Sequence, residues 1–180
     1  MKKTNQYNLT LSAVFLALGM VLPLLTAQIK EIGDTLLPMH LPVMLCGLLC
    51  GPWQGLAVGL MLPFLRSAFF GMPPIYPNAI WMALELATYG FTIGLFYTRQ
   101  KKKNLAGLYL SLIAAMLCGR LVWGAAKAIL LGLSGKAFPL IGFWTGGFLD
   151  ALPGIALQLI LIPAIMSIIH RKSGLTQKGE

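Results

Sequence analysis

The chain alternates long apolar segments with short polar connections. The apolar segments comprise residues 9–27, 36–50, 52–70, 77–97, 105–133 and 141–169. Most of them reach the ~20 apolar residues that a helix needs to cross a bilayer. The pattern therefore predicts an all-α integral membrane protein, in which residues 1–180 form a single membrane domain of six transmembrane helices.

The second segment differs from the others because it is short. Its 15 residues would make a helix of ~22 Å, less than the ~30 Å hydrocarbon core, and they include Pro38 and Pro42. We expect a short or partly irregular helix packed inside the bundle, since irregular backbone cannot face lipid. The first segment is long for the apolar part of a signal peptide, and we expect it to remain as the first crossing.

Composition excludes a soluble protein. Of the 180 residues, 57% are hydrophobic and 11% are charged, whereas a soluble domain carries about 25% charged residues. The chain would lack the polar surface that a soluble fold needs. The net charge of +9 would suggest a nucleic-acid partner in a soluble protein, but we expect none here because the excess lies in the connections.

The basic residues are distributed unevenly between the two predicted sides of the membrane. Lys and Arg concentrate in connections that stay in the cytoplasm, so we predict that both termini are cytoplasmic. The basic residues are Lys2, Lys3, Arg99, Lys101, Lys102, Lys103, Arg171, Lys172 and Lys178 on the predicted cytoplasmic side, and Lys30 and Lys136 on the other.

Small residues recur every four positions in the first three segments. This spacing lets two helix backbones approach closely, either within the chain or against a partner. The residues are Ala13 and Ala17 in the first segment, and Gly47, Gly51, Gly55 and Gly59 across the second and third.

Polar side chains within the apolar segments are the candidates for a binding site, because ionisable groups at this depth normally line a cavity or pair with each other. They form one stripe on the fourth helix and another on the fifth, at helical spacings of three, four and seven. At 1.5 Å per residue from the outer helix ends, nearly all charged members lie in the outer half of the membrane. The candidate substrate-binding residues are Asn78, Trp81, Glu85, Tyr89, Arg120, Trp123, Lys127 and Asp150.

The balance of these charges suggests the kind of ligand. With Arg66, the segments hold three positive and two negative charges. The excess favours a ligand with a carboxylate or phosphate, bound by Arg120 and Lys127. In the alternative interpretation, Glu85 and Asp150 only neutralise these two cations in structural pairs, and Arg66 extends to the lipid headgroups.

Sequence motifs give no sign of an enzyme. No GxxxxGK[ST] motif occurs, so we expect that the chain does not hydrolyse ATP itself, and GxSxG and HExxH are absent too. Three cysteines without a CxxC pair and two histidines give no basis for a metal site, and we expect no cofactor. The two halves share no internal repeat of the kind found in autonomous transporters. Coupling to an energised partner is therefore the simpler interpretation.

In these features the chain resembles the substrate-binding S components of energy-coupling factor (ECF) vitamin transporters. The resemblance covers nearly the whole chain, with six helices and both termini inside. It rests on the AxxxA pattern of Ala13 and Ala17, the GPxxGxxxG turn at residues 51–59, and the stretch LPMHLPVMLCGLLCG at residues 37–51.

The resemblance implies an S-component bundle in a bacterial plasma membrane. It implies that the chain captures a vitamin or related metabolite from outside and docks on a membrane T component that carries two ATPase subunits. The docking surface would include Ala13 and Ala17, and the pocket would be covered by the loops at residues 28–35, 71–76 and 134–139. Transport would involve toppling of the S component in the bilayer.

The substrate stays open at this point. The excess positive charge makes pantothenate the first expectation, followed by pyridoxine-type vitamins, riboflavin and queuosine precursors. The alternative from another class is a small polytopic membrane protein with a structural or regulatory role, which would bind a partner through its glycines and carry no ligand.

Overall fold

The computed structural model describes residues 2–26, 37–100, 104–135, 137 and 139–176. Helices make up nearly all of these residues, and no strand occurs among them. The helices are α1 (Lys2–Val21), α3 (His40–Cys50), α4 (Pro52–Phe70), α5 (Ile80–Arg99), α6 (Leu105–Leu133), α7 (Leu140–Trp144) and α8 (Leu152–Thr176). A 3₁₀ turn (Leu22–Thr26) follows α1, and π-helical turns precede α5 (Ile75–Ala79) and α8 (Thr145–Leu149). The prediction of an all-α protein is thus confirmed over the described residues.

Four helical stretches are long and apolar enough to cross a membrane. By contrast, α3 has 11 residues, because the second apolar segment becomes helical only at His40, after a turn at Pro38 and Met39. The sixth apolar segment is also interrupted, because the π-helical turn separates α7 from α8. The four stretches are Asn5–Leu24, Ile75–Arg99, Leu105–Leu133 and Leu140–Ile169.

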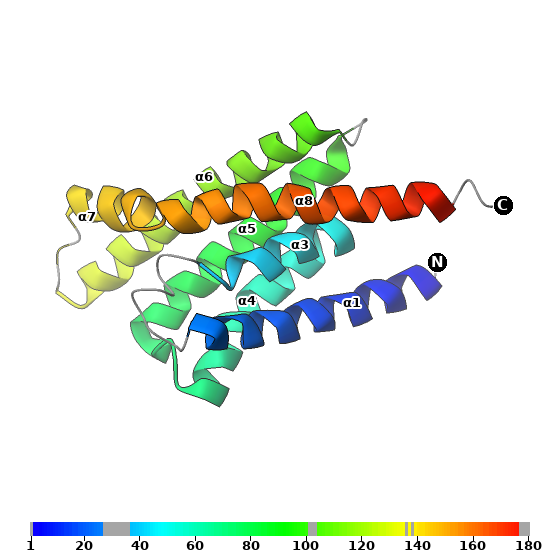
Figure 1. Ribbon diagram of the computed structural model, residues 1–180. Coiled ribbons are helices and arrows are strands. Elements are labelled where there is room, and N and C mark those ends of the chain that lie inside the picture. The colour runs from blue at the N-terminus through cyan, green and yellow to red at the C-terminus, as the bar shows by residue number, and fades with distance from the viewer. Residues whose placement is uncertain (1, 27–36, 101–103, 136, 138, 177–180) are drawn as a thin grey trace.

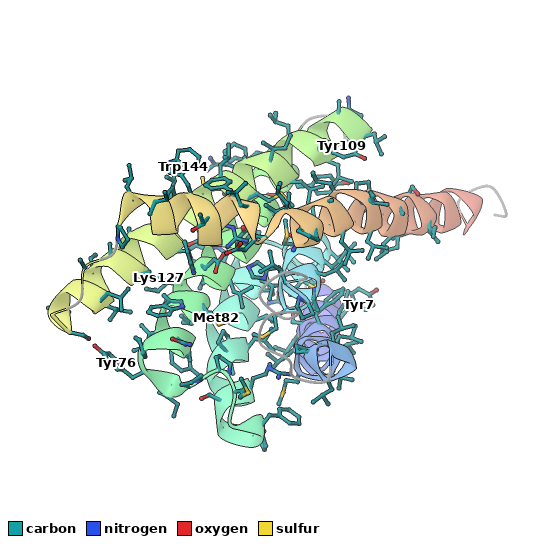
Figure 2. All side chains as sticks on the ribbon, turned by 60° about the vertical axis from the view of Figure 1, so that its left-hand side comes forward. Tyr7, Tyr76, Met82, Tyr109, Lys127 and Trp144 are labelled. Carbon is teal, nitrogen blue, oxygen red and sulfur yellow. The ribbon has the colours of Figure 1, made fainter. Side chains whose placement is uncertain are left out.

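The helices alternate in direction along the bundle (Figure 1). The beginning of α1 and the end of α8 lie at the same end of the molecule, together with the α3–α4 turn. The connections from α4 to α5 and from α6 to α7 lie at the opposite end. Figure 2 shows Tyr7 and Tyr109 toward the first end and Tyr76 toward the second.

The regularly spaced glycines bring α3 and α4 against α5. A Cβ on Gly55 would lie 2.6 Å from the carbonyl oxygen of Gly90, and Gly47 closes on the same oxygen. A Cβ on Gly59 would lie 2.5 Å from the carbonyl oxygen of Leu86. Backbones this close exclude any side chain, so the glycine spacing is used for packing within the chain.

Helix α1 packs on this core through one face only. Phe15 is buried there, and a Cβ on Gly19 would lie 2.5 Å from the Leu62 side chain of α4. Ala13 and Ala17 lie on the exposed side of α1. The small-residue pair of α1 therefore takes no part in packing the bundle.

Candidate ligand cavity

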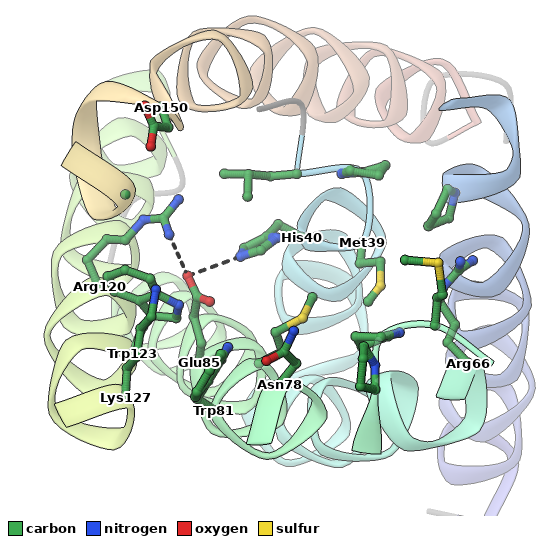
Figure 3. Close-up of a pocket in the computed structure, with 18 of the residues that line it drawn as sticks. Met39, His40, Arg66, Asn78, Trp81, Glu85, Arg120, Trp123, Lys127 and Asp150 are labelled. Atoms are coloured by element: carbon green, nitrogen blue, oxygen red, sulfur yellow. Dashed lines mark hydrogen bonds and ion pairs between the residues drawn. The ribbon is translucent and has the colours of Figure 1, made fainter. Parts of the chain in front are cut away.

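A cavity of about 500 Å³ lies among α3, α4, α5, α6 and the π-helical turn before α8. This volume is within the range of pockets that hold small organic ligands. Figure 3 shows how side chains from all of these elements point into it. Tyr76 lies in the connection between α4 and α5. Its hydroxyl forms a 2.9 Å hydrogen bond with the hydroxyl of Ser134 and so joins this connection to the end of α6. Residues 28–35, the first loop expected to cover the pocket, lie outside the described residues.

The structure brings together seven of the eight substrate-binding candidates. They line the cavity from three elements: Asn78, Trp81 and Glu85 before and on α5, Arg120, Trp123 and Lys127 on α6, and Asp150 before α8. The eighth, Tyr89, does not line it. Its side chain is 1% exposed and lies one turn further along α5, with its ring edge-on to His40 at 4.9 Å.

Glu85 is the centre of a buried ionic cluster at the wall of the cavity (Figure 3). Its Oε1 accepts a hydrogen bond of 3.0 Å from Nη1 of Arg120 and lies 3.3 Å from Nε2 of His40. All three side chains are about 3% exposed. The structural pair considered for Glu85 and Arg120 is therefore formed, and it joins α3, α5 and α6. A buried carboxylate needs such partners because its desolvation is costly.

Lys127 and Arg120 both lie against the face of Trp123. The Lys127 ammonium is 4.5 Å from the ring centroid of Trp123 and 5.4 Å from that of Trp81, and the Arg120 guanidinium is 5.9 Å from Trp123. Cations at these distances are attracted by the negative face of the ring. Trp123 in turn packs on the backbone of Gly146 and Gly147, where an added Cβ would lie 3.4 Å from the ring.

Arg66 turns into the molecule and does not extend to the headgroups. Its side chain is 3% exposed, and Nη1 donates a 2.7 Å hydrogen bond to the carbonyl oxygen of Met20 in the last turn of α1. The guanidinium lies 5.3 Å from the ring centroid of Phe70. Arg66 and Pro23, which follows α1, both line the cavity, so the end of α1 forms part of its wall.

Asp150 differs from Glu85 in its surroundings. It is exposed and makes no ion pair with any residue that the structure describes. Pro153 lies in the first turn of α8, where a proline leaves no hydrogen bond of the helix unformed. The irregular backbone lies earlier, in the π-helical turn whose Thr145 carbonyl accepts the Asp150 amide at 2.9 Å.

Two cationic or titratable residues of the wall were not among the candidates. They are His40 on α3 and Arg66 on α4, which both line the cavity. The signal that could have identified them is the rule that polar groups within apolar segments face a cavity. Across the described ranges, no three His, Cys, Asp or Glu side chains are grouped to hold a metal.

Helices long enough to cross a membrane and a cavity of small-molecule size are features that solute-binding transport subunits share. Residues 7–166 match the family model described as "ECF transporter, substrate-specific component". Because this match covers most of the chain, the protein belongs to that family. It is a transport subunit and not a catalytic one, and the family implies a small-molecule substrate and partners in the membrane. No curated protein sequence and no solved structure matches the chain.

Proposed function

We propose that the chain is the high-affinity capture subunit of an ATP-driven ECF importer for a small water-soluble vitamin or related metabolite. The observation that carries this proposal is the cavity, in which the Glu85–Arg120 pair lies beside two tryptophans within a volume of about 500 Å³. Apolar walls with a few convergent polar groups are typical of sites that bind small organic molecules.

In the proposed topology, the chain crosses a bacterial plasma membrane six times and both termini are cytoplasmic. The alternating helix directions and the position of the beginning of α1 beside the end of α8 at one end of the molecule support an even number of crossings (Figure 1). The basic residues of the termini support their cytoplasmic location. The cavity lies at the opposite end of the molecule, which would then face outward.

In the proposed site, Arg120 and Lys127 bind an anionic group of the substrate, while Trp81 and Trp123 provide apolar contact. Both cations are already held against Trp123, so little side-chain entropy is lost on binding. Pantothenate, which is an anion, is the first expectation among the vitamins. Pyridoxine-type vitamins, riboflavin and queuosine precursors are the next.

The proposed partners are a membrane T component and two ATPase subunits. Ala13 and Ala17 would form the docking surface for the T component. Their exposed position on α1 supports this role, because small residues let a partner helix approach closely.

Small-molecule mass spectrometry tests the proposed function. The protein is purified in detergent from cells grown in rich medium and heat-denatured, and the released compounds are compared with those from a control membrane protein. We expect a stoichiometric vitamin-like mass. A blank, repeated after incubation with a broad vitamin mixture, would contradict capture and favour a ligand-free partner protein.

A variant then tests the site. Lys127→Met should weaken binding of the identified ligand by at least ~10-fold, the effect of one charged hydrogen bond. Arg99→Met, which removes a positive charge at an exposed residue outside the cavity, serves as the matched control. Binding by Lys127→Met within threefold of the unmodified protein would remove Lys127 from the site.

A further inference from the structure

One edge of the Arg120 guanidinium has no partner among the described residues. Nη1 is used by Glu85, but Nε and Nη2 are buried without any hydrogen bond. The N–H groups of Nε and Nη2 point in parallel from the same edge of the planar group. The side chain is 3% exposed and lines the cavity. Buried donors of this kind are normally satisfied, so the free edge indicates a missing acceptor.

We propose that the ligand carries a single carboxylate, whose two oxygens accept hydrogen bonds from Nε and Nη2 of Arg120. This inference rests on the proposed capture function and specifies its substrate class. Two parallel N–H groups match the two oxygens of a planar carboxylate, and the pairing adds both strength and orientation. The bond from Nη1 to Glu85 holds the guanidinium in place, so its free edge is preorganised for binding.

The charges of the wall select a monoanion. Among the wall residues that the structure describes, three cations and two carboxylates leave one positive charge, which one carboxylate balances. A phosphate dianion or a dicarboxylate would leave a negative excess in a site of low polarity, where such an excess is costly. The residues counted are Arg66, Arg120, Lys127, Glu85 and Asp150.

Asp150 strengthens this selection. Figure 3 shows it on the same side of the cavity as Arg120, and it has no ion-pair partner within the described part of the chain. A second negative charge on the ligand would meet this unpaired carboxylate, and like charges repel, although solvent reduces the repulsion because Asp150 is exposed. Asp150 is therefore a specificity residue against dianions.

Paired compounds test the carboxylate directly. The probes are pantothenate with panthenol, nicotinate with nicotinamide, and biotin with its amide, together with riboflavin, pyridoxine and pyridoxal 5′-phosphate. Thermal shift in detergent finds the binding compound, and equilibrium titration measures its affinity. We expect a monocarboxylate to bind and its neutral counterpart to bind at least ~10-fold more weakly, as for the loss of one charge-assisted pair.

Variants assign the carboxylate to Arg120. Arg120→Lys keeps the charge and removes the parallel N–H groups of Nε and Nη2, so the preference for the acid over its neutral counterpart should fall severalfold. The control Arg99→Lys should leave this preference unchanged. If Arg120→Lys does not fold, the paired variant Glu85→Gln/Arg120→Gln avoids an unpartnered buried charge and should also lose the preference. A full preference retained in these variants would overturn the inference.

The outcomes separate this inference from the capture function. Tight binding of riboflavin, pyridoxine or pyridoxal 5′-phosphate would overturn the inference that the ligand is a monocarboxylate, but it would support the capture function. If no probe binds, the compound released from the purified protein decides: one carboxylate supports the inference, and none overturns it. If no probe binds and no compound is released from the purified protein, both the carboxylate inference and the capture function fail.

Discussion

Replacing each acid of the cavity by its amide should have very different effects on the stability of the ligand-free protein. Glu85→Gln removes the charge that partners Arg120 at 3.0 Å and His40 at 3.3 Å, all at about 3% exposure. Asp150→Asn removes a charge that is exposed and has no ion pair in the described ranges. Both substitutions replace a carboxylate by the amide of the same shape, so Asp150→Asn is the matched control.

The magnitude follows from burial. Breaking a buried ion pair on one side typically costs ~3–5 kcal/mol, because the remaining charge stays buried and uncompensated. We expect the lower end, ~3 kcal/mol, since the amide oxygen of glutamine can still accept a hydrogen bond from Arg120. For a chain of this size, 1 kcal/mol shifts the melting temperature by ~2–4 °C, so Glu85→Gln should lower it by ~6–12 °C. Asp150→Asn should change stability by less than ~0.5 kcal/mol.

Thermal unfolding of the purified proteins measures both effects. Cys46 and Cys50 are buried and Cys118 is half-buried, so in a Cys118→Ala background a thiol-reactive fluorescent dye reports the opening of the core. Introduced into an Arg120→Gln background, Glu85→Gln should cost much less, because it no longer leaves that buried cation unpaired. Equal shifts for Glu85→Gln and Asp150→Asn, or a shift below ~3 °C for Glu85→Gln, would refute the structural role of the cluster.

Three further predictions concern helix packing and docking. Gly55→Ala places a Cβ 2.6 Å from a backbone carbonyl oxygen of α5 and should destabilise the protein by ~1–3 kcal/mol. Its control, Gly132→Ala on α6, meets nothing within 4 Å and should be neutral or stabilising by up to ~1 kcal/mol in the same unfolding assay. Arg66→Met leaves the carbonyl of α1 that it binds without this donor and should cost ~1–3 kcal/mol; an unchanged melting temperature would contradict that role. Replacing Ala13 and Ala17 with Trp should abolish ATP-driven uptake while detergent-solubilised protein still binds ligand, and lost binding would show that the pair packs within the chain.

The part of the fold that sequence could predict is the part set by local pattern. The length of each apolar run predicts a helix, since backbone groups in lipid must be satisfied within the segment. The break between α7 and α8 could not be predicted in the same way, because it depends on a tertiary contact. The Trp123 ring packs on Gly146 and Gly147, where an added Cβ would lie 3.4 Å from it. The Gly-Gly pair was the one local signal of the break between α7 and α8.

In the site, too, local pattern could be predicted from the sequence and tertiary contacts could not. Helical spacing predicted that Glu85 and Arg120 lie on polar stripes of two successive helices, because positions three, four and seven apart share one face of a helix. The same spacing included Tyr89, which lies below the cavity because the His40 ring from α3 covers it. Spacing within a helix shows which residues share a face, but the depth of a cavity is decided by the neighbouring helix.

The two sets of small residues have the same spacing but different surroundings, and this difference bears on the choice between capture and a ligand-free partner protein. The alternative needs the glycines of α3 and α4 to be free for another protein. Gly47 and Gly55 instead close on the carbonyl oxygen of Gly90 in α5, so a partner helix cannot reach them without dismantling the core. Ala13 and Ala17 remain exposed on α1, and the end of that helix is tied to the cavity wall by Arg66. An exposed pair of small residues and a contact to the cavity wall thus lie on the same helix, which favours the proposed subunit that both captures and docks over the ligand-free alternative.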